Sequence, residues 1–431
     1  MAANDSKRDE LTMRDGNYLG HAMVGRVGEF IQIRRDIHAH PELAFEEHRT
    51  AALVAGKLRD WGYEVTTGLG QTGVVGTLRR GKSTRSLGLR ADMDALPILE
   101  AGTQAWASKK PGLMHGCGHD GHTATLLAAA RLIAQDLDFD GVLHLIFQPA
   151  EEGAGGAVQM MADGLFERFP CDAVFALHNM PGIEAGRFVF RSGPTMASSD
   201  NVTIRLKGRG GHGAFPHQSV DTVVAAASIV MALQTIVSRN VDPLKTAVVT
   251  VGALHAGEAN NVIPEEARLE LSVRALDTDV RALLKERIMA LVELQAASYG
   301  VQASIDWREG YAVLVNTPEE TALATAVALK LFGPGRVDPN GPMFTASEDF
   351  SFMLQRVPGC YFFVGNGGPG TPGACNVHNP GYDFNDDIIA PGAAFWMALV
   401  ERHFAPKEQP PRKLPGKRTD LTASDPITSG P

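Results

Sequence analysis

The segment GLMHGCGHDGHTA, residues 112–124, concentrates side chains that can bind metals or act as nucleophiles. Between His115 and His122 it contains three histidines, one cysteine and one aspartate, separated by glycines. Such a cluster could hold a metal ion, carry a thiolate nucleophile or form a tight turn into a helix. The spacing of these residues leaves all three interpretations open.

Further polar side chains follow apolar runs that have the length and composition of buried strands. The run SLGLRAD leads to Asp94, and LHLIFQPA leads to Glu151 and Glu152. The run AVFALH ends at His178, and CYFFVG leads through a glycine-rich loop to His378. Because ligands of open α/β sheets bind beyond the carboxyl ends of the strands, we expect these side chains to converge there.

Five of these side chains form a mixed set of sulfur, nitrogen and oxygen donors: Cys117, His119, Glu152, His178 and His378. Donors of this softness suit zinc best, and manganese, cobalt or nickel are other divalent ions that could bind. Five protein ligands exceed a single open tetrahedral site. They suit two metal ions roughly 3.5–4 Å apart that share a bridging group.

The carboxylate beside the ligand Glu152 has a natural role in this arrangement. The side chain of Glu151 is expected to point in the opposite direction from that of Glu152, and it can take the proton of a water that the metals activate. Asp94 could orient a ligand or the base by a hydrogen bond. We interpret His115, Asp120 and His122 as braces of the loop.

Two other kinds of site are less consistent with the sequence. A couple of Cys117 and His119 could form a thiol protease, but no third residue that would orient it is apparent. The glycine-rich stretches EEGAGGA and GRGGHGAFPH could cradle phosphate, yet neither is followed by the Lys-Ser/Thr of a phosphate-binding loop. We therefore favour a metal site.

The composition restricts the class of protein. The chain has 431 residues, 44% hydrophobic and 21% charged, as in ordinary globular proteins. A net charge of −9 and the absence of a basic stripe argue against binding to nucleic acid. No apolar run of about 18 residues predicts a membrane span. The polar amino terminus and four dispersed cysteines indicate a reduced, cytoplasmic protein.

Periodicity predicts an α/β fold, a mostly parallel sheet with helices on both faces. Residues 14–193 alternate strands and helices, and residues 309–405 resume this alternation after an interruption. We therefore expect one catalytic domain made of these two parts. Residues 406–431 are rich in proline and charge, without periodic apolar positions, and predict a flexible tail.

The interruption, residues 194–308, has a different pattern. Predicted strands at NVTIRLKG, TAVVTVGAL, ARLELSVRAL and QASIDWRE alternate with helices near 220–239 and 279–300. This β-α-β-β-α-β order is that of a ferredoxin-like α+β domain. We expect an independent inserted domain that acts as a lid or a dimerisation surface.

Eight motifs resemble one family of enzymes. MHGCGHDGHTA, RADMDALPI, QPAEEG, LHNMPG, GGHGAFPH, SEDFSFM and HNPGYDFND, with IHAHPELAFEEHRTA before them, resemble the aminoacylase and hippurate hydrolase branch of the dinuclear metallopeptidases. Bacterial N-acyl-amino-acid amidohydrolases and plant auxin-conjugate hydrolases belong to this branch. The resemblance covers roughly residues 25–404, in order. It implies that the five donors above are metal ligands and that Glu151 is the general base.

The resemblance also implies roles for three residues of the inserted domain. His212, in GGHGAFPH, is expected to stabilise the oxyanion of the tetrahedral intermediate, across a dimer interface in some arrangements. Asn261 and Arg274 match positions that bind the substrate carboxylate, which an arginine can hold by a bidentate fork. From the residues alone, His212 would be interpreted as a loop histidine and Arg274 as a surface residue of a strand. The family further implies a homodimer or higher homo-oligomer formed through the inserted domain.

We expect hydrolysis of the amide bond of a small-molecule N-acyl-amino acid, by two divalent metal ions and Glu151. A dipeptidase or carboxypeptidase with the same metal chemistry is one alternative. A metal-stabilised relative without catalysis is another, although the intact pair of Glu151 and Glu152 argues against it. The segment EAGTQAWASKKPG departs from the usual sequence of the family, so the resemblance leaves substrate preference open but still implies metal binding.

Overall fold

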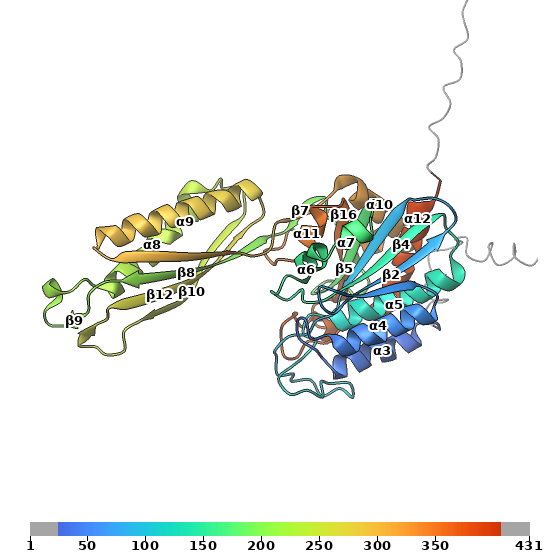
Figure 1. Cartoon of the computed structure of the whole chain (residues 1–431), viewed down its shortest axis with the longest axis horizontal. Helices are drawn as coiled ribbons and strands as arrows, with labels where there is room; N and C mark the ends of the chain where they lie inside the picture. The colour runs from blue at the N-terminus through green and yellow to red at the C-terminus, as the bar shows by residue number, and fades with distance from the viewer. Residues whose placement is uncertain (1–24, 407–431) are drawn as a thin grey trace, which may run out of the picture.

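A computed structural model describes residues 25–406, which form two bodies placed one after the other along the longest axis (Figure 1). The larger body contains both ends of the described chain, and the smaller one is inserted into it. Residues 14–24 of the expected catalytic domain lie outside the described residues. So does the tail expected over 406–431, except for its first residue.

The larger body is built on an eight-stranded sheet. In spatial order its strands are β1 (Glu64–Leu69), β2 (Gly73–Arg80), β4 (Gly141–Gln148), β3 (Ser86–Asp92), β5 (Ala173–Pro181), β16 (Gly359–Gly367), β6 (Phe188–Val189) and β15 (Val337–Asp338). The central strands β4, β3, β5 and β16 are parallel neighbours. Antiparallel pairs occur toward the edges, where β1 pairs with β2, β2 with β4 and β16 with β6.

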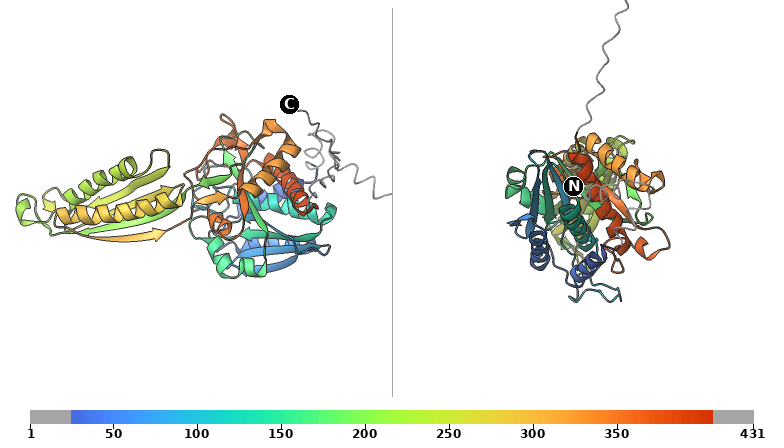
Figure 2. Two further views of the ribbon diagram at one scale, coloured as in Figure 1. Left: turned by 90° about the horizontal axis from the view of Figure 1, so that it is seen from above. Right: turned by 90° about the vertical axis from the view of Figure 1, so that its right-hand side faces the viewer.

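Helices cover both faces of this sheet because its central strands are apolar on both sides (Figure 2). In β5, Phe175 and Leu177 belong to the core on one face, and Val174 and Ala176 to the core on the other. The first face packs against α3 (Gly28–Ala39), α4 (His48–Asp60), α5 (His119–Asp136), α10 (Pro318–Phe332) and α12 (Ile389–Phe404). The second packs against α6 (Gly156–Ala162), α7 (Leu165–Arg168) and α11 (Phe350–Leu354). The predicted fold class is confirmed.

The inserted body has its own sheet and its own core. Its elements are β8 (Ser198–Lys207), α8 (Thr222–Asn240), β10 (Ala247–Ala256), β12 (Glu266–Ala275), α9 (Thr278–Ser298) and β13 (Gln302–Glu309). The sheet order β10-β12-β8-β13 is antiparallel throughout, and both helices lie on one face (Figure 1). This is the ferredoxin-like arrangement that the β-α-β-β-α-β order predicts.

Short elements complete the described structure. Two two-stranded pairs are formed by β7 (Gly193–Met196) with β14 (Leu314–Asn316) and by β9 (Gly211–His212) with β11 (Val262–Ile263). The first pair lies where the chain passes between the two bodies, and the second lies at the far tip of the inserted body (Figure 1). Single 3-10 turns occupy Pro216–Gln218, Pro334–Arg336, Pro372–Ala374 and Asp386–Ile388.

Helix α8 has apolar residues on both its buried and its exposed face. Among the described residues it is the one helix long and apolar enough to cross a membrane, which is weak evidence because core helices pass the same test. Its inner face packs Ile229 and Leu233 into the core of the inserted body. Its outer face exposes Val224 by 50% and Met231 by 71%. The apolar composition of α8 thus serves one buried face and one exposed face.

Candidate metal centre and active site

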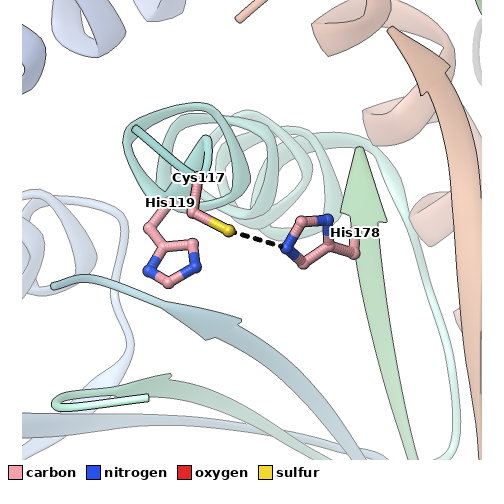
Figure 3. A group of neighbouring side chains, drawn as sticks. All are labelled: Cys117, His119 and His178. Atoms are coloured by element: carbon pink, nitrogen blue, oxygen red, sulfur yellow. Dashed lines mark hydrogen bonds between the residues drawn. The ribbon is translucent and has the colours of Figure 1, made fainter. Parts of the chain in front are cut away.

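The five predicted metal ligands converge at the carboxyl edge of the large sheet. Cys117 precedes α5, and His119 is its first residue (Figure 3). Glu152 lies in the turn after β4, His178 is in the last part of β5, and His378 is in the loop after β16. The parallel strands β4, β5 and β16 end side by side, which brings side chains far apart in sequence together.

Distances between donor atoms fit a metal site. Cys117 Sγ lies 3.4 Å from His178 Nε2, and His378 Nε2 lies 3.1 Å from Glu152 Oε1. The donor atoms of Cys117, His119 and His178 are all within 4.8 Å of one another, as are those of Cys117, Glu152 and His378. The two groups share Cys117. The arrangement therefore offers donors for two neighbouring ions.

One buried atom indicates what these side chains bind. His119 Nε2 is buried and has no hydrogen-bond partner among the described residues, although it lies 4.0 Å from Glu152 Oε1. A buried polar atom left unpaired is costly, and coordination to a cation would satisfy it. The donor set of one thiol, three imidazoles and one carboxylate also matches the preference of zinc and similar ions. The residues present therefore fit a metal centre.

The pKa shifts of the predicted ligands show which protonation states a bound cation would have to stabilise. Burial, and next the charges of Glu152 and Glu151, raise the pKa of the Cys117 thiol well above its usual value. Burial lowers the pKa of His178 well below its usual value. Burial disfavours the charged form of His119, but Asp92 and Asp94 outweigh it and raise the pKa to about 10. A bound cation is what would stabilise a thiolate and a neutral imidazole here.

Hydrogen bonds orient two of the histidine ligands. His119 Nδ1 lies 3.1 Å from Asp94 Oδ1 and 3.0 Å from the Asp94 carbonyl oxygen. His178 Nδ1 donates to the Asn179 carbonyl at 2.6 Å. When Nδ1 carries the proton and is held in this way, the lone pair of Nε2 is available to bind a metal. Asp94 also accepts from the Glu152 backbone N–H at 2.9 Å, so one aspartate fixes parts of two ligands.

The loop of the HGCGHDGH segment is short. We interpreted His115, Asp120 and His122 as braces of this loop, but α5 begins at His119, so the loop ends at Gly118 and Asp120 and His122 lie in the helix. Gly118 has a φ of 100°, in the left-handed region. A Cβ at this position would lie 2.2 Å from Asn179 Oδ1 and 2.5 Å from the Tyr382 hydroxyl. The turn into α5 therefore requires glycine.

The three residues interpreted as braces have different surroundings. His122 Nδ1 lies 2.6 Å from Asp92 Oδ1, and its Nε2 lies 2.7 Å from Asn179 Oδ1. Asp120 Oδ2 lies 2.7 Å from Arg34 Nε. His115 is buried with neither ring nitrogen hydrogen-bonded within the described chain, and burial lowers its pKa to about 4.

Glu151 is buried among other carboxylates. Its side chain is near Glu348 and Asp349, whose carboxylate oxygens lie within 4.8 Å of its own. Burial, followed by the charges of Glu348 and Glu152, raises the pKa of Glu151 well above its usual value. A carboxylate with raised proton affinity is suited to accept a proton during a reaction.

A buried arginine holds these acidic groups in place. Arg90 donates to Asp92 Oδ2 at 2.6 Å, to Glu348 Oε1 at 2.9 Å and to Asp349 Oδ1 at 3.3 Å. The sequence interpretation did not assign Arg90, Glu348 or Asp349 to the site. A signal for each existed, since Arg90 lies two residues before Asp92 in β3 and SEDFSFM is one of the resembling motifs.

A cavity of about 520 Å³ opens over four of the predicted metal ligands, Cys117, Glu152, His178 and His378. Its walls come from both bodies, and Arg274 of β12 lines it together with Ser199 and Asn201 of β8. The apolar part of the lining consists of Met180, Met196, Ala346, Phe363 and Val377. No residue of EAGTQAWASKKPG lines this cavity.

The other two predicted residues of the inserted body lie away from this cavity. His212 is in β9 and Asn261 immediately precedes β11, and these two strands pair with each other. Both side chains are exposed, and their strands are at the tip opposite the larger body (Figure 1). Of His212, Asn261 and Arg274, only Arg274 therefore lines the cavity of its own chain.

Comparisons with known proteins identify the family. Residues 88–402 match the family model of Peptidase family M20/M25/M40. The chain belongs to this family. Hippurate hydrolase of Campylobacter jejuni is 45% identical over 376 residues, which cover 87% of this chain and 97% of that protein. Thermostable carboxypeptidase 2 of Saccharolobus solfataricus is 37% identical, covering 84% of this chain and 92% of that protein.

A solved structure agrees with these relatives. The YXEP protein of Bacillus subtilis, described as a dinuclear metal binding peptidase from the M20 family, is 30% identical with a TM-score of 0.75. The similarity covers 87% of this chain and 98% of that one. The predicted resemblance is confirmed, and the protein is an amidohydrolase of this family.

Replacement of Gly118 tests the geometry of the metal loop. Gly118→Ala should lose most of its bound metal and lower the free energy of unfolding by more than about 1 kcal/mol, because it combines a disfavoured φ with a clash against Asn179. Gly112→Ala is the matched control, since Gly112 also has a positive φ, of 87°, but nothing within 4 Å of an added Cβ. Metal content by elemental analysis and denaturant unfolding would measure both. Equal metal content in the two variants would contradict this account.

Proposed function

We propose that the protein is a metal-dependent amidohydrolase that cleaves N-acyl-amino acids, of the hippurate or N-acetyl type, into a carboxylic acid and a free amino acid. The observation that carries this proposal is the position of Glu151, buried beside the metal ligand Glu152 and under a cavity that Arg274 also lines. The hippurate hydrolase relative supports the substrate class.

We infer that the ligands Cys117, His119, Glu152, His178 and His378 hold two divalent ions. When bound, the ions supply Lewis acidity that polarises the amide carbonyl and makes water a better nucleophile. Zinc is the ion that the thiol and imidazole donors favour, with manganese, cobalt or nickel as alternatives. The M20 relative described as dinuclear supports the number of ions.

Glu151 moves the proton in this proposal. Its carboxylate takes a proton from the attacking water and delivers it to the nitrogen of the leaving amine. The raised pKa that burial and Glu348 give it strengthens proton uptake. Arg90 holds Glu348 and Asp349 in place, so their charges are fixed beside Glu151.

Arg274 is the residue that we propose to hold the substrate carboxylate. Its Nη1 donates to the Thr345 carbonyl at 2.9 Å and lies 3.4 Å from Ser347 Oγ. Nε and Nη2 make no hydrogen bond among the described residues, so they remain as a fork for a carboxylate. The apolar walls, which include Met180 and Phe363, would receive the acyl group.

Substitution of Glu151 tests the mechanism. Glu151→Gln should keep two bound metal ions but lose turnover by several orders of magnitude, because the amide cannot accept the proton. Glu167→Gln, which changes a well-exposed glutamate of the same body, should behave as wild type. Near-normal activity of Glu151→Gln would remove this residue from the mechanism. In the wild-type protein, chelation should abolish activity and metal addition should restore it. This result would exclude a protein that binds metal without catalysis.

A second candidate function is cleavage of free peptides, which the carboxypeptidase relative favours. The two kinds of substrate differ in the acyl part of the scissile amide. An N-acyl-amino acid carries an apolar acyl group there, whereas a dipeptide carries a charged amine, which would face the apolar walls. Burying that charge there is unfavourable. We therefore expect N-benzoyl- and N-acetyl-amino acids to give a kcat/KM at least about tenfold above that of the matching dipeptides. A panel of these substrates measures the ratio, and the reverse order would favour the peptidase.

We propose that the protein forms a homodimer through the inserted body and that His212 acts in the cavity of the partner subunit. His212 and Asn261 are exposed at a tip remote from their own cavity, so a second copy would have to bring them to a cavity. The exposed apolar residues of the inserted body, Val224, Met231 and Leu254 among them, supply a surface for association. β10 is also an open edge of the sheet.

Mixing of two inactive variants tests the dimer. His212→Ala and Glu151→Gln should each be nearly inactive alone. Reassociated in equal amounts, they should recover roughly a quarter of the wild-type rate, because half of the dimers then contain one complete site. No recovery in a mixture whose subunits are shown to exchange would contradict action across the interface.

We further propose a cytoplasmic location. All four cysteines, at positions 117, 171, 360 and 375, are free. Free thiols, one of them proposed as a metal ligand, suit a reducing compartment. Secretion of the active protein with an oxidised Cys117 would argue against this location.

A further inference from the structure

The chain passes from the inserted body back to the larger body through the segment that follows β13. This segment begins at Gly310 and Tyr311, before β14. Tyr311 lines the cavity, and its ring packs at right angles to that of Phe352, with centroids 6.2 Å apart. None of the motifs that carry the proposed chemistry contains this tyrosine. Its contacts nevertheless lead directly to the proposed base.

The Tyr311 hydroxyl forms hydrogen bonds with the residues immediately before and after the proposed metal ligand Glu152. It donates to the carbonyl oxygen of Glu151. It accepts from the backbone N–H of Gly153 at 2.6 Å. A single side chain of the inter-body segment therefore clamps the turn that presents the base and one ligand.

This turn depends on such contacts because its backbone is strained. Ala150, just before it, has a φ of 55°, a left-handed value that costs a residue with a side chain roughly 1–3 kcal/mol. Gly153 has a φ of 83°. Strained backbone persists only where its surroundings determine it. Here the Ala150 N–H donates to Glu47 and the Glu152 N–H donates to Asp94, both at 2.9 Å. Tyr311 supplies the remaining hydrogen bonds to the turn.

The backbone of Tyr311 is in turn fixed to the inserted body. Its carbonyl accepts from the Ser199 N–H at 3.0 Å. The Gly310 N–H donates to the buried Asp200 at 3.1 Å, and Asp200 pairs with Arg281 of α9, whose Nε is 3.0 Å away. A Cβ on Gly310 would lie 2.2 Å from the Ser199 carbonyl oxygen. The segment is therefore bonded directly to the inserted body.

We propose that Tyr311 is a positioning residue that couples the orientation of the inserted body to the Glu151–Glu152 turn. Movement of the inserted body displaces the Tyr311 hydroxyl, and with it the carbonyl of the base and the N–H that follows the ligand. The same body carries Arg274, so the residue proposed to hold the substrate and the clamp on the base are both attached to it. Substrate binding and placement of the base are thereby linked. This inference rests on the proposed role of Glu151.

Tyr311→Phe tests the coupling because it removes only the hydroxyl. In the full-length, metal-loaded protein with hippurate as substrate, we expect kcat to fall roughly 10- to 100-fold, since a small misplacement of a catalytic group has effects of this size. KM should change little because Arg274 and the apolar walls remain, and metal content should stay at the wild-type level. Tyr299→Phe, a partly exposed tyrosine of the same inserted body, is the matched control. A purely structural role would lower stability but leave kcat per metal-loaded protein unchanged.

A double-mutant cycle with Gly310→Ala tests whether the position of the inserted body acts through the hydroxyl. Gly310→Ala should lower kcat by pushing the segment away from Ser199. In combination with Tyr311→Phe it should lower kcat no further, because the link is already broken. If the double variant instead lowered kcat by the product of the two single-variant factors, the proposal would be overturned. Should Tyr311→Phe fail to fold, a wild-type kcat in Gly310→Ala would overturn it.

The result is separable from the proposed function. An inactive Glu151→Gln with a wild-type kcat in Tyr311→Phe would remove the coupling and leave the base in place. An active Glu151→Gln would instead remove the base, whatever Tyr311→Phe does.

Discussion

The centre of this protein is a dense group of buried acids, imidazoles and one thiol at the carboxyl edge of the large sheet. Asp92, Asp94 and Glu151 are each at most 6% exposed, and they surround ligands whose donor atoms lie within a few ångströms of one another. Burial of so much negative charge is unfavourable without nearby cations. Arg90 supplies one such cation, and the two metal ions that we propose supply the others. The surrounding fold has to hold the donors in this arrangement.

The large sheet meets this requirement through its parallel core. Strands β4, β5 and β16 each end next to a ligand-bearing segment, and α5 begins at one of the ligands. Hydrogen bonds from Asp94 and from the Asn179 carbonyl fix two imidazole rings, so the donors are oriented before a metal arrives. Glycine at position 118 allows the close approach of Asn179. Two ligands, His119 and His178, belong to α5 and β5, and the other three lie in short loops that these strands and helices hold in place.

The inserted body contributes differently. It brings Arg274 to the cavity and connects to the base through Tyr311, whereas His212 and Asn261 lie at its far end. One domain thus serves the site of its own chain at one end and offers exposed groups at the other. The length of β8, β10 and β12 sets the separation between the two ends, which no single subunit could close by rotating a side chain.

Local patterns in the sequence determined much of the fold. The apolar runs SLGLRAD and GVLHLIFQ are β3 and β4, and the β-α-β-β-α-β order of the inserted body was predictable from periodicity. Short elements such as β6, β15 and α11 were not predicted, because two to five residues carry no periodic signal. The start of α5 at His119 was also missed, since glycines on either side of a histidine favour a loop in any local interpretation.

Residue types and their positions after predicted strands indicated five metal ligands and a base, and the family resemblance implied the same roles. The tertiary structure decided which further groups surround them. Arg90, Glu348 and Tyr311 are distant in sequence from Glu151 and come near it only when the sheet forms and the chain returns from the inserted body. It also decided that Arg274 and His212, both in that body, lie at opposite ends. Such separations depend on strand register and chain path, which short-range patterns do not encode.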